Sequence, residues 1–208
     1  MVKAAILAAF VALAPIAAPV FAEPGAAEVQ TLAALVSAAR QQVGITRVYD
    51  PAYVNLDFPG GDVPADRGVC TDVVIRAMRE GLGVDLQRAV NRDMRAHFAA
   101  YPKIWGLSRT DANIDHRRVP NLIKLLDRLD ARLPEGSSFE PGDLVTSTVS
   151  GNLPHIMIVS DRDGADGPLV IHNIGRGARE EAALNDWPKT GHFRLDEKVL
   201  SRLRALDQ

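Results

Sequence analysis

The sequence predicts an α+β fold in which N-terminal helices pack on an antiparallel sheet. Apolar residues recur with helical spacing before Pro134, whereas after it they gather in short runs rich in Val and Ile. Short connections containing Gly, Asn and Pro separate these runs, and connections of that length favour antiparallel hairpins. Helices followed by a run of strands is the order of an α+β protein rather than of an alternating α/β protein.

Two helices are expected before Gly81. The first covers residues 28–43, where leucines and valines fall on one face, and Gly44 ends it. The second covers residues 71–80, with an apolar inner face and with Gly81 and Gly83 as its end. The long segment between them is interrupted by prolines and glycines, and an irregular loop of that length usually serves a function.

Three more helices complete the helical part. Asp85 can cap a helix over residues 86–99, and Pro120 is tolerated in the first turn of a helix over residues 119–133. A closing helix is expected over residues 197–206. The strands, recognised by their Val and Ile content, are expected at 143–149, 155–160, 169–173 and 191–195.

Residues 1–22 have the pattern of a secretory signal peptide. A positive start at Lys3 precedes an alanine-rich apolar run, and small residues favour cleavage after Ala22. An uncleaved membrane anchor is the alternative, but two prolines and the weak hydrophobicity of alanine argue against it. We therefore expect a single domain over residues 23–208, periplasmic or secreted, with no stable membrane insertion after the signal is removed.

The charge balance is that of an ordinary globular domain. The chain has 24 Lys and Arg residues against 26 Asp and Glu residues, a formal net charge of −2. This balance gives no support for nucleic-acid binding or for strong attraction to an anionic membrane surface.

Cys70 is the single cysteine of the chain. An exported protein enters a compartment that oxidises thiols, and one cysteine cannot close an internal disulfide, so this thiol points to reactivity. Cys70 stands where the loop after Gly68 enters the expected helix. Because a helix amino terminus favours the thiolate, we expect a lowered pKa for Cys70. The alternative is a small apolar core residue.

Two histidines occupy positions from which they can serve this thiol. His155 stands at the start of one expected strand, and His172 stands near the end of the next. Neighbouring antiparallel strands can place both side chains on one face of the sheet. We expect Cys70 to be the nucleophile, His155 the base and His172 the group that orients the base. With the register shifted by one residue, Asn173 takes the orienting role.

Four short motifs carry a resemblance to a known group of proteins. They are Gly-Val-Cys-Thr-Asp at 68–72, Pro-Gly-Asp-Leu-Val at 141–145, Leu-Pro-His-Ile-Met-Ile-Val at 153–159 and Val-Ile-His-Asn-Ile at 170–174. The chain resembles the NlpC/P60 cysteine peptidases and, more closely, the DUF1287 family of bacterial exported proteins. Two further patterns, at 58–64 and 113–120, fit the DUF1287 family as well.

This resemblance implies a papain-like α+β fold and a hydrolase that needs no cofactor and no metal. Cys70 would attack a peptide carbonyl, and His155 would take the thiol proton and later give one to the leaving amine. His172 would hold His155 in the right tautomer, and the backbone N–H of Cys70 would help to bind the oxyanion. NlpC/P60 enzymes commonly cut stem peptides of the bacterial cell wall, so the expected substrate is a peptidoglycan stem peptide.

The residues before the cysteine supply two candidate substrate-binding side chains, Tyr53 and Asp62. NlpC/P60 proteins often have an aromatic hydroxyl where this chain has Phe58, and Tyr53 or Tyr49 can substitute for it. They usually have Asp-Cys-Ser-Gly at the nucleophile, whereas this chain has Val-Cys-Thr-Asp. Asp62 belongs to the motif at 58–64.

A basic cluster before the fourth helix supplies two more candidates, His116 and Arg117, beside Arg118. Guanidinium groups suit carboxylates, so the cluster is a candidate clamp for a substrate carboxylate. The alternative is a solvated start of the helix.

Three other functions stay open from the sequence. Cys70, His155 and His172 could be the ligands of a zinc hydrolase, although they lack the close pairing common in zinc sites. The chain could be a non-catalytic envelope module that binds peptidoglycan. The same thiol–imidazole pair also serves acyl transfer to an amine instead of to water.

Overall fold

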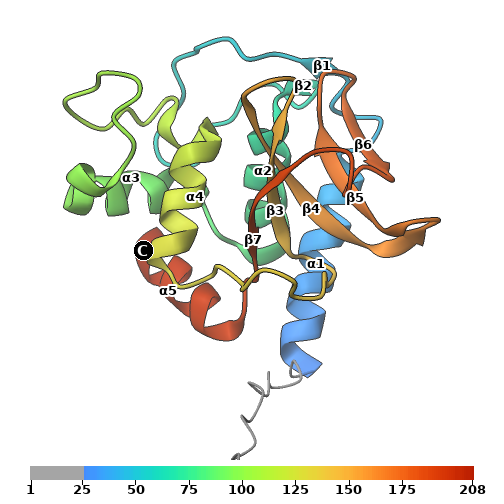
Figure 1. The fold of residues 1–208 in the computed structure, drawn as a ribbon. Helices are drawn as coiled ribbons and strands as arrows, with labels where there is room; N and C mark the ends of the chain where they lie inside the picture. The colour runs from blue at the N-terminus through green and yellow to red at the C-terminus, as the bar shows by residue number, and fades with distance from the viewer. Residues whose placement is uncertain (1–25) are drawn as a thin grey trace, which may run out of the picture.

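The protein has the predicted α+β architecture (Figure 1). The structure, a computed structural model, describes residues 26–208, so the expected signal peptide at 1–22 lies outside the described residues. The described α-helices are α1 (Ala26–Gln41), α2 (Cys70–Leu82), α3 (Leu86–His97), α4 (Val119–Arg128) and α5 (Glu197–Asp207). The strands are β1 (Val48–Tyr49), β2 (Arg67–Gly68), β3 (Leu144–Val149), β4 (Leu153–Gly164), β5 (Gly167–Asn173), β6 (Ala178–Glu181) and β7 (Lys189–Phe193).

The main sheet has five strands in the order β6-β5-β4-β3-β7, and every neighbouring pair is antiparallel. The expected β3–β4 and β4–β5 hairpins are therefore confirmed. The sequence did not predict β6, because Ala-Arg-Glu-Glu has no apolar alternation. It also did not predict the two-residue parallel pair of β1 and β2, which ties Val48 to Arg67 inside the segment expected to be irregular.

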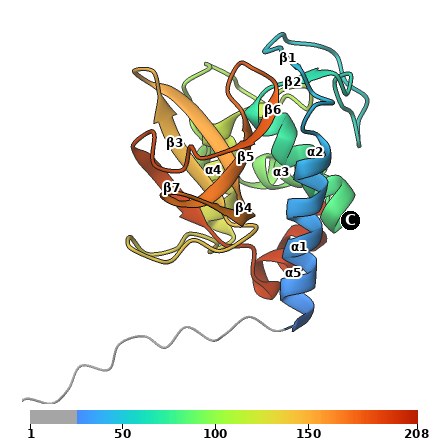
Figure 2. The same cartoon turned by 90° about the vertical axis from the view of Figure 1, so that its right-hand side faces the viewer.

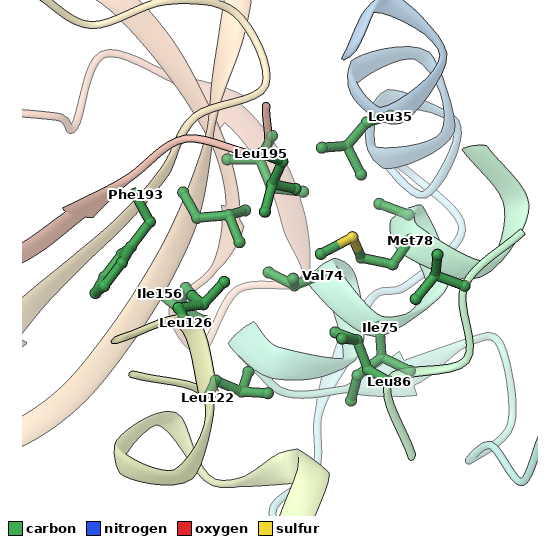
Figure 3. Packing of buried hydrophobic residues seen from close by; sticks show 14 of the residues in the cluster. Leu35, Val74, Ile75, Met78, Leu86, Leu122, Leu126, Ile156, Phe193 and Leu195 are labelled. Atoms are coloured by element: carbon green, nitrogen blue, oxygen red, sulfur yellow. The ribbon is translucent and has the colours of Figure 1, made fainter. Parts of the chain in front are cut away.

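The helices cover one face of this sheet. Figure 2 shows α1 and α2 as a layer beside the strands. Side chains of the two layers meet in the core, where Leu35 of α1 and Met78 of α2 point toward Ile156 and Phe193 of the sheet (Figure 3). Each fully buried side chain of this size stabilises the fold by roughly 1.5–3 kcal/mol. A second, smaller apolar cluster covers the other face of the sheet and contains Met157.

Two helix ends differ from the predictions. Gly81 does not end α2, which continues to Leu82 and is capped by Gly83 with φ 64°. Gly81 instead allows a close helix contact, because a Cβ there would lie 2.7 Å from the backbone oxygen of Ala34 in α1.

Helix α4 ends at Arg128 rather than at residue 133. Asp130 takes a left-handed φ of 61°, and the chain then turns toward β7. There the N–H of Leu133 donates to the carbonyl of His192 over 2.8 Å. The last residues of the expected helix therefore satisfy their backbone groups on the sheet edge.

No helix in the described part of the chain is long and apolar enough to cross a membrane.

Candidate active site

Cys70 is the first residue of α2, as predicted. The Asp72 carboxylate caps this helix end by accepting a hydrogen bond of 2.6 Å from the N–H of Val69. Gly68, with φ 152°, brings β2 close to that carboxylate, since a Cβ at Gly68 would lie 2.8 Å from the Asp72 Cβ. A glycine before the cysteine is therefore needed to bring the strand against the helix start.

A buried ion pair holds this helix start in place. Arg117 Nε donates to Asp72 over 2.8 Å, and each side chain is only 2% exposed. Arg117 also donates to the carbonyls of Ala52 and Asp50, and its own carbonyl accepts a hydrogen bond from the Thr71 hydroxyl. Arg117 does bind a carboxylate, but that carboxylate belongs to Asp72, so the guanidinium is not free for a substrate.

The thiol of Cys70 is buried, with 5% of the residue exposed. Burial raises its pKa to about 11, although the backbone amides of Ile156, Thr71 and Cys70 face the sulfur and lower it. The Asp72 carboxylate raises the pKa further. The expected lowering of the thiol pKa is therefore wrong for this state of the protein: desolvation outweighs the helix terminus.

His155 and His172 meet on one face of the sheet, as predicted. His155 Nε2 lies 2.8 Å from His172 Nδ1, and the two rings make an edge contact at 5.0 Å. The Trp187 ring packs against both, with centroids at 5.9 and 6.1 Å. Burial, and then the neighbouring His172, lower the pKa of His155 to about 3. Burial also lowers the pKa of His172, and the charge of Glu181 opposes that shift.

Asn173, the alternative orienter, does not contact His155. Its side-chain amide donates to the carbonyl of Gly68 over 2.9 Å, and its side-chain oxygen accepts a hydrogen bond from the Gly175 N–H. Asn173 therefore ties the end of β5 to β2, beside the cysteine loop.

The Cys70 sulfur faces β4 at Ile156, beyond the point where β4 stops pairing with β5. Pairing between these strands stops at Ile158 and Ile171 on this side. The N–H of Val159 points to the β3 side, where it donates to Asp143 over 2.8 Å. Because N–H directions alternate along a strand, the N–H of Ile156 points to the open β5 side, where the sulfur faces it.

Sulfur and imidazole therefore approach the same end of β4. His155 precedes Ile156, and by alternation it shares the sheet face of Met157, opposite to the helices. Within residues 26–208, no hydrogen bond joins the Cys70 sulfur to the His155 ring, and no residue there hydrogen-bonds to His155 Nδ1.

A pocket of about 310 Å³ opens beside the thiol. Apolar side chains dominate its lining, including Ile114, Trp105 and Pro154. The guanidinium of Arg118 stacks over Trp105 at 4.1 Å and donates to Asp115 over 3.1 Å. The pocket therefore presents an apolar surface with a cation at its wall.

Tyr49, rather than Tyr53, is the tyrosine at this pocket. Burial raises the pKa of Tyr49, and the neighbouring Cys70 and Asp72 side chains raise it further. The Tyr53 hydroxyl instead donates to the Asp111 carboxylate over 3.1 Å.

Asp62 and His116 are also absent from the residues that line the pocket. The Asp62 carboxylate accepts hydrogen bonds from Arg76, whose guanidinium also holds the carbonyls of Val63 and Arg67 and so fixes the loop before the cysteine. His116 is buried, and burial together with the charge of Arg117 lowers its pKa to about 4. Of the four candidate substrate-binding residues, only Arg117 reaches the pocket.

Glu181 is a site residue that sequence reasoning missed. Its carboxylate lies 3.1 Å from His172 Nε2, so Glu181, His172 and His155 form a continuous chain across β6, β5 and β4. The glycine-rich turn at 175–177 was the available signal, because such a turn after β5 favours a further hairpin strand.

The zinc alternative gains no support from this geometry. In the part of the chain that the structure describes, no three His, Cys, Asp or Glu side chains are grouped so that they could hold a metal ion.

Comparison with known proteins places the chain in a family. The family described as "Domain of unknown function (DUF1287)" matches residues 36–195. A curated relative from Escherichia coli (strain K12), described as "Uncharacterized protein YijF", is 52% identical over 171 residues. That match covers 80% of this chain and 83% of the relative.

Proposed function

The chain belongs to the DUF1287 family, and we propose that it is an exported cysteine hydrolase of papain-like type that cuts bacterial cell-wall peptides. One observation carries this proposal. The sulfur of Cys70 lies at the amino terminus of α2 and is faced by three backbone amides, one of them that of Ile156 in β4. His155, the residue before Ile156, belongs to the buried His155–His172 pair. Acyl transfer requires a nucleophile, a base and an orienting group, and Cys70, His155 and His172 are the residues at this end of β4 that can supply them.

The resting pair is a neutral thiol and a neutral imidazole, because the pKa of Cys70 is raised and that of His155 is lowered. The thiol proton therefore passes to His155 as the sulfur attacks the peptide carbonyl, in general-base fashion. The carbon–sulfur bond forms and the carbonyl π bond opens. The N–H of Cys70 and the Tyr49 hydroxyl stabilise the resulting oxyanion.

The tetrahedral intermediate then collapses. The carbon–nitrogen bond breaks, His155 gives its proton to the leaving amine, and a thioester remains on Cys70. Water, deprotonated by His155, attacks the thioester and releases the acid with a restored thiol. Acyl transfer follows the same steps with an amine in place of water.

The pocket supports a peptide substrate with an apolar portion and a carboxylate. Ile114 and Trp105 offer apolar contact, and the Arg118 guanidinium offers a cation beside it. A cell-wall stem peptide combines both kinds of group. The export pattern at 1–22 supports a periplasmic or secreted location, which suits this substrate.

The test is cleavage of soluble stem-peptide fragments, released from peptidoglycan by a muramidase and followed by mass spectrometry. Wild-type protein is expected to produce new peptide fragments, and Cys70→Ala none. Circular dichroism checks that Cys70→Ala is folded. Equal cleavage by both proteins would overturn the proposal.

A non-catalytic peptidoglycan-binding module is the second candidate. The raised pKa of Cys70 and the missing hydrogen bond between its sulfur and His155 favour it. In that case neither protein cleaves the fragments, and both bind them with equal affinity in isothermal titration calorimetry.

A further inference from the structure

Glu181 ends a chain of side-chain contacts that leads to His155. Glu181 Oε1 lies 3.1 Å from His172 Nε2, and His172 Nδ1 lies 2.8 Å from His155 Nε2. The His172 side chain is fully buried, and Trp187 covers both rings from one side. The contact between the two histidines therefore lies where water competes weakly for the hydrogen bond, whereas the Glu181 side chain is 28% exposed.

The chemistry of these three side chains determines which ring nitrogen of each histidine carries the proton. An ionised carboxylate only accepts hydrogen bonds, so His172 must carry its proton on Nε2. The Nδ1 of a neutral His172 is then an acceptor, so His155 must donate from Nε2. The remaining nitrogen of His155, Nδ1, is left without a proton and can act as a base.

We propose that Glu181 is a positioning residue that sets the tautomers of His172 and His155 and so keeps Nδ1 of His155 ready to accept the Cys70 proton. This inference rests on the proposed hydrolase function for its catalytic consequence, but the tautomers themselves can be measured without any substrate.

The surroundings of Glu181 fit this role. Arg176 lies 3.4 Å from its second oxygen, so a cation pairs with the same carboxylate that contacts His172. Glu180, the preceding residue on the same strand, pairs with Arg40 and Arg162 and has no contact with either histidine. Glu180 therefore offers a matched control, because it has the same charge and lies on the same strand but makes no hydrogen bond to His172 or His155.

The experiment compares Glu181→Gln with Glu180→Gln by two-bond ¹⁵N–¹H correlation of the histidine rings. The chain has 5 histidines, so the signals can be assigned by single substitutions. In the wild type we expect both His155 and His172 to carry the proton on Nε2. A glutamine at 181 can donate as well as accept, so Glu181→Gln is expected to populate the opposite tautomer of both rings, whereas Glu180→Gln leaves them unchanged.

Cleavage of the muramidase-released fragments supplies the second readout. We expect Glu181→Gln to lower kcat about 10-fold or more with little change in KM, since outer partners of functional histidines commonly have effects of about 10–100-fold. Glu180→Gln is expected to keep the wild-type kcat.

The outcomes separate this inference from the proposed function. Wild-type tautomers in Glu181→Gln, or a proton on Nδ1 of His155 in the wild type, would overturn the role of Glu181 even if Cys70 is required for cleavage. Altered tautomers in a protein whose cleavage does not depend on Cys70 would support the positioning role and overturn the hydrolase proposal.

Discussion

The described sheet contains two networks in which a histidine contacts a carboxylate, and one of them reaches the end of β4 that the Cys70 sulfur faces. In the first, His172 lies between Glu181 and His155, at the strand end that Cys70 approaches. In the second, His192 Nε2 lies 2.7 Å from Asp143. Both networks contain a contact between a histidine and a carboxylate, but they differ in the other side chain that the histidine contacts.

We call the second network, formed by His192, Asp143 and Arg194, the closed network, and the first, formed by Glu181, His172 and His155, the open network. Asp143 is fully buried and accepts two hydrogen bonds of 2.9 Å from Arg194. Although burial opposes it, hydrogen bonds from His192 and Arg194 hold the pKa of Asp143 below its ordinary value. The His192 ring stacks on Phe139 at 4.4 Å. The two pairs differ in that His172 also contacts a second imidazole, that of His155, whereas His192 stacks on the apolar ring of Phe139, and we infer that only the first pair is a candidate site.

The largest expected effect comes from breaking the Arg117–Asp72 ion pair at the start of α2, next to Cys70. Arg117→Leu leaves the Asp72 carboxylate buried without its partner, which is expected to cost about 4 kcal/mol of unfolding free energy and to reduce cleavage. Urea denaturation measures the stability. Arg162→Leu, which removes an exposed arginine from Glu180, is the control and is expected to cost less than about 1 kcal/mol. Equal losses of unfolding free energy in the two variants would show that the buried Asp72–Arg117 pair stabilises the protein no more than an exposed pair does.

The closed network is expected to matter for stability and not for cleavage. Asp143→Asn leaves His192 without its carboxylate and leaves Arg194 paired with Glu140 alone, and we expect a loss of about 3 kcal/mol in urea denaturation. Below the unfolding transition, the cleavage rate per folded molecule should equal that of the wild type. A large loss of cleavage at unchanged stability would reverse the assignment of the two networks.

Acid is expected to destabilise the protein through the open network. The pKa of His155 falls from about 6.5 in the unfolded chain to about 3 in the folded protein. The unfolded state therefore binds the extra proton between these values, and stability falls as the pH drops from about 6.5 to about 3. His155→Asn should reduce that slope by up to about 1.4 kcal/mol per pH unit, measured by urea denaturation in steps of pH.

A second histidine allows a check on that slope. His116 is also buried, with its pKa lowered to about 4. His116→Asn should also make the free energy of unfolding depend less on pH between pH 4 and pH 6.5. A wild-type slope in both variants would contradict the buried, neutral state of these rings.

The smallest effect concerns the reactivity of the thiol. Because burial raises the pKa of Cys70 to about 11, iodoacetamide should alkylate the folded protein slowly at pH 7, and the rate should rise up to about pH 11. In urea the midpoint should return to about 8.5, the ordinary value for a thiol. Rapid alkylation of the folded protein with a midpoint below 8.5 would instead indicate a thiolate–imidazolium pair.

Local patterns predicted the parts of the site that depend on neighbours in sequence. The entry of a loop into a helix placed Cys70, and the spacing of two Val- and Ile-rich strands placed His155 and His172 together. Both inferences need only the period of a helix or strand and the short connection between strands.

Contacts between distant residues could not be predicted in this way. Arg117 and Asp72 are 45 positions apart, and nothing local indicates that the carboxylate bound by Arg117 lies inside the protein. Glu181 was hidden because β6 consists of charged residues. The pKa of Cys70 depends on how completely the fold removes water, which a sequence pattern does not contain.

The most direct measurement compares cleavage of stem-peptide fragments by His155→Asn and His192→Asn, with each rate corrected for the folded fraction. The proposed mechanism makes His155 the base, so we predict a loss of at least about 100-fold in His155→Asn, in line with the usual contribution of a general base. His192→Asn should keep the wild-type rate per folded molecule. Equal rates in the two variants would contradict the assignment of the active site to the Cys70 end of β4.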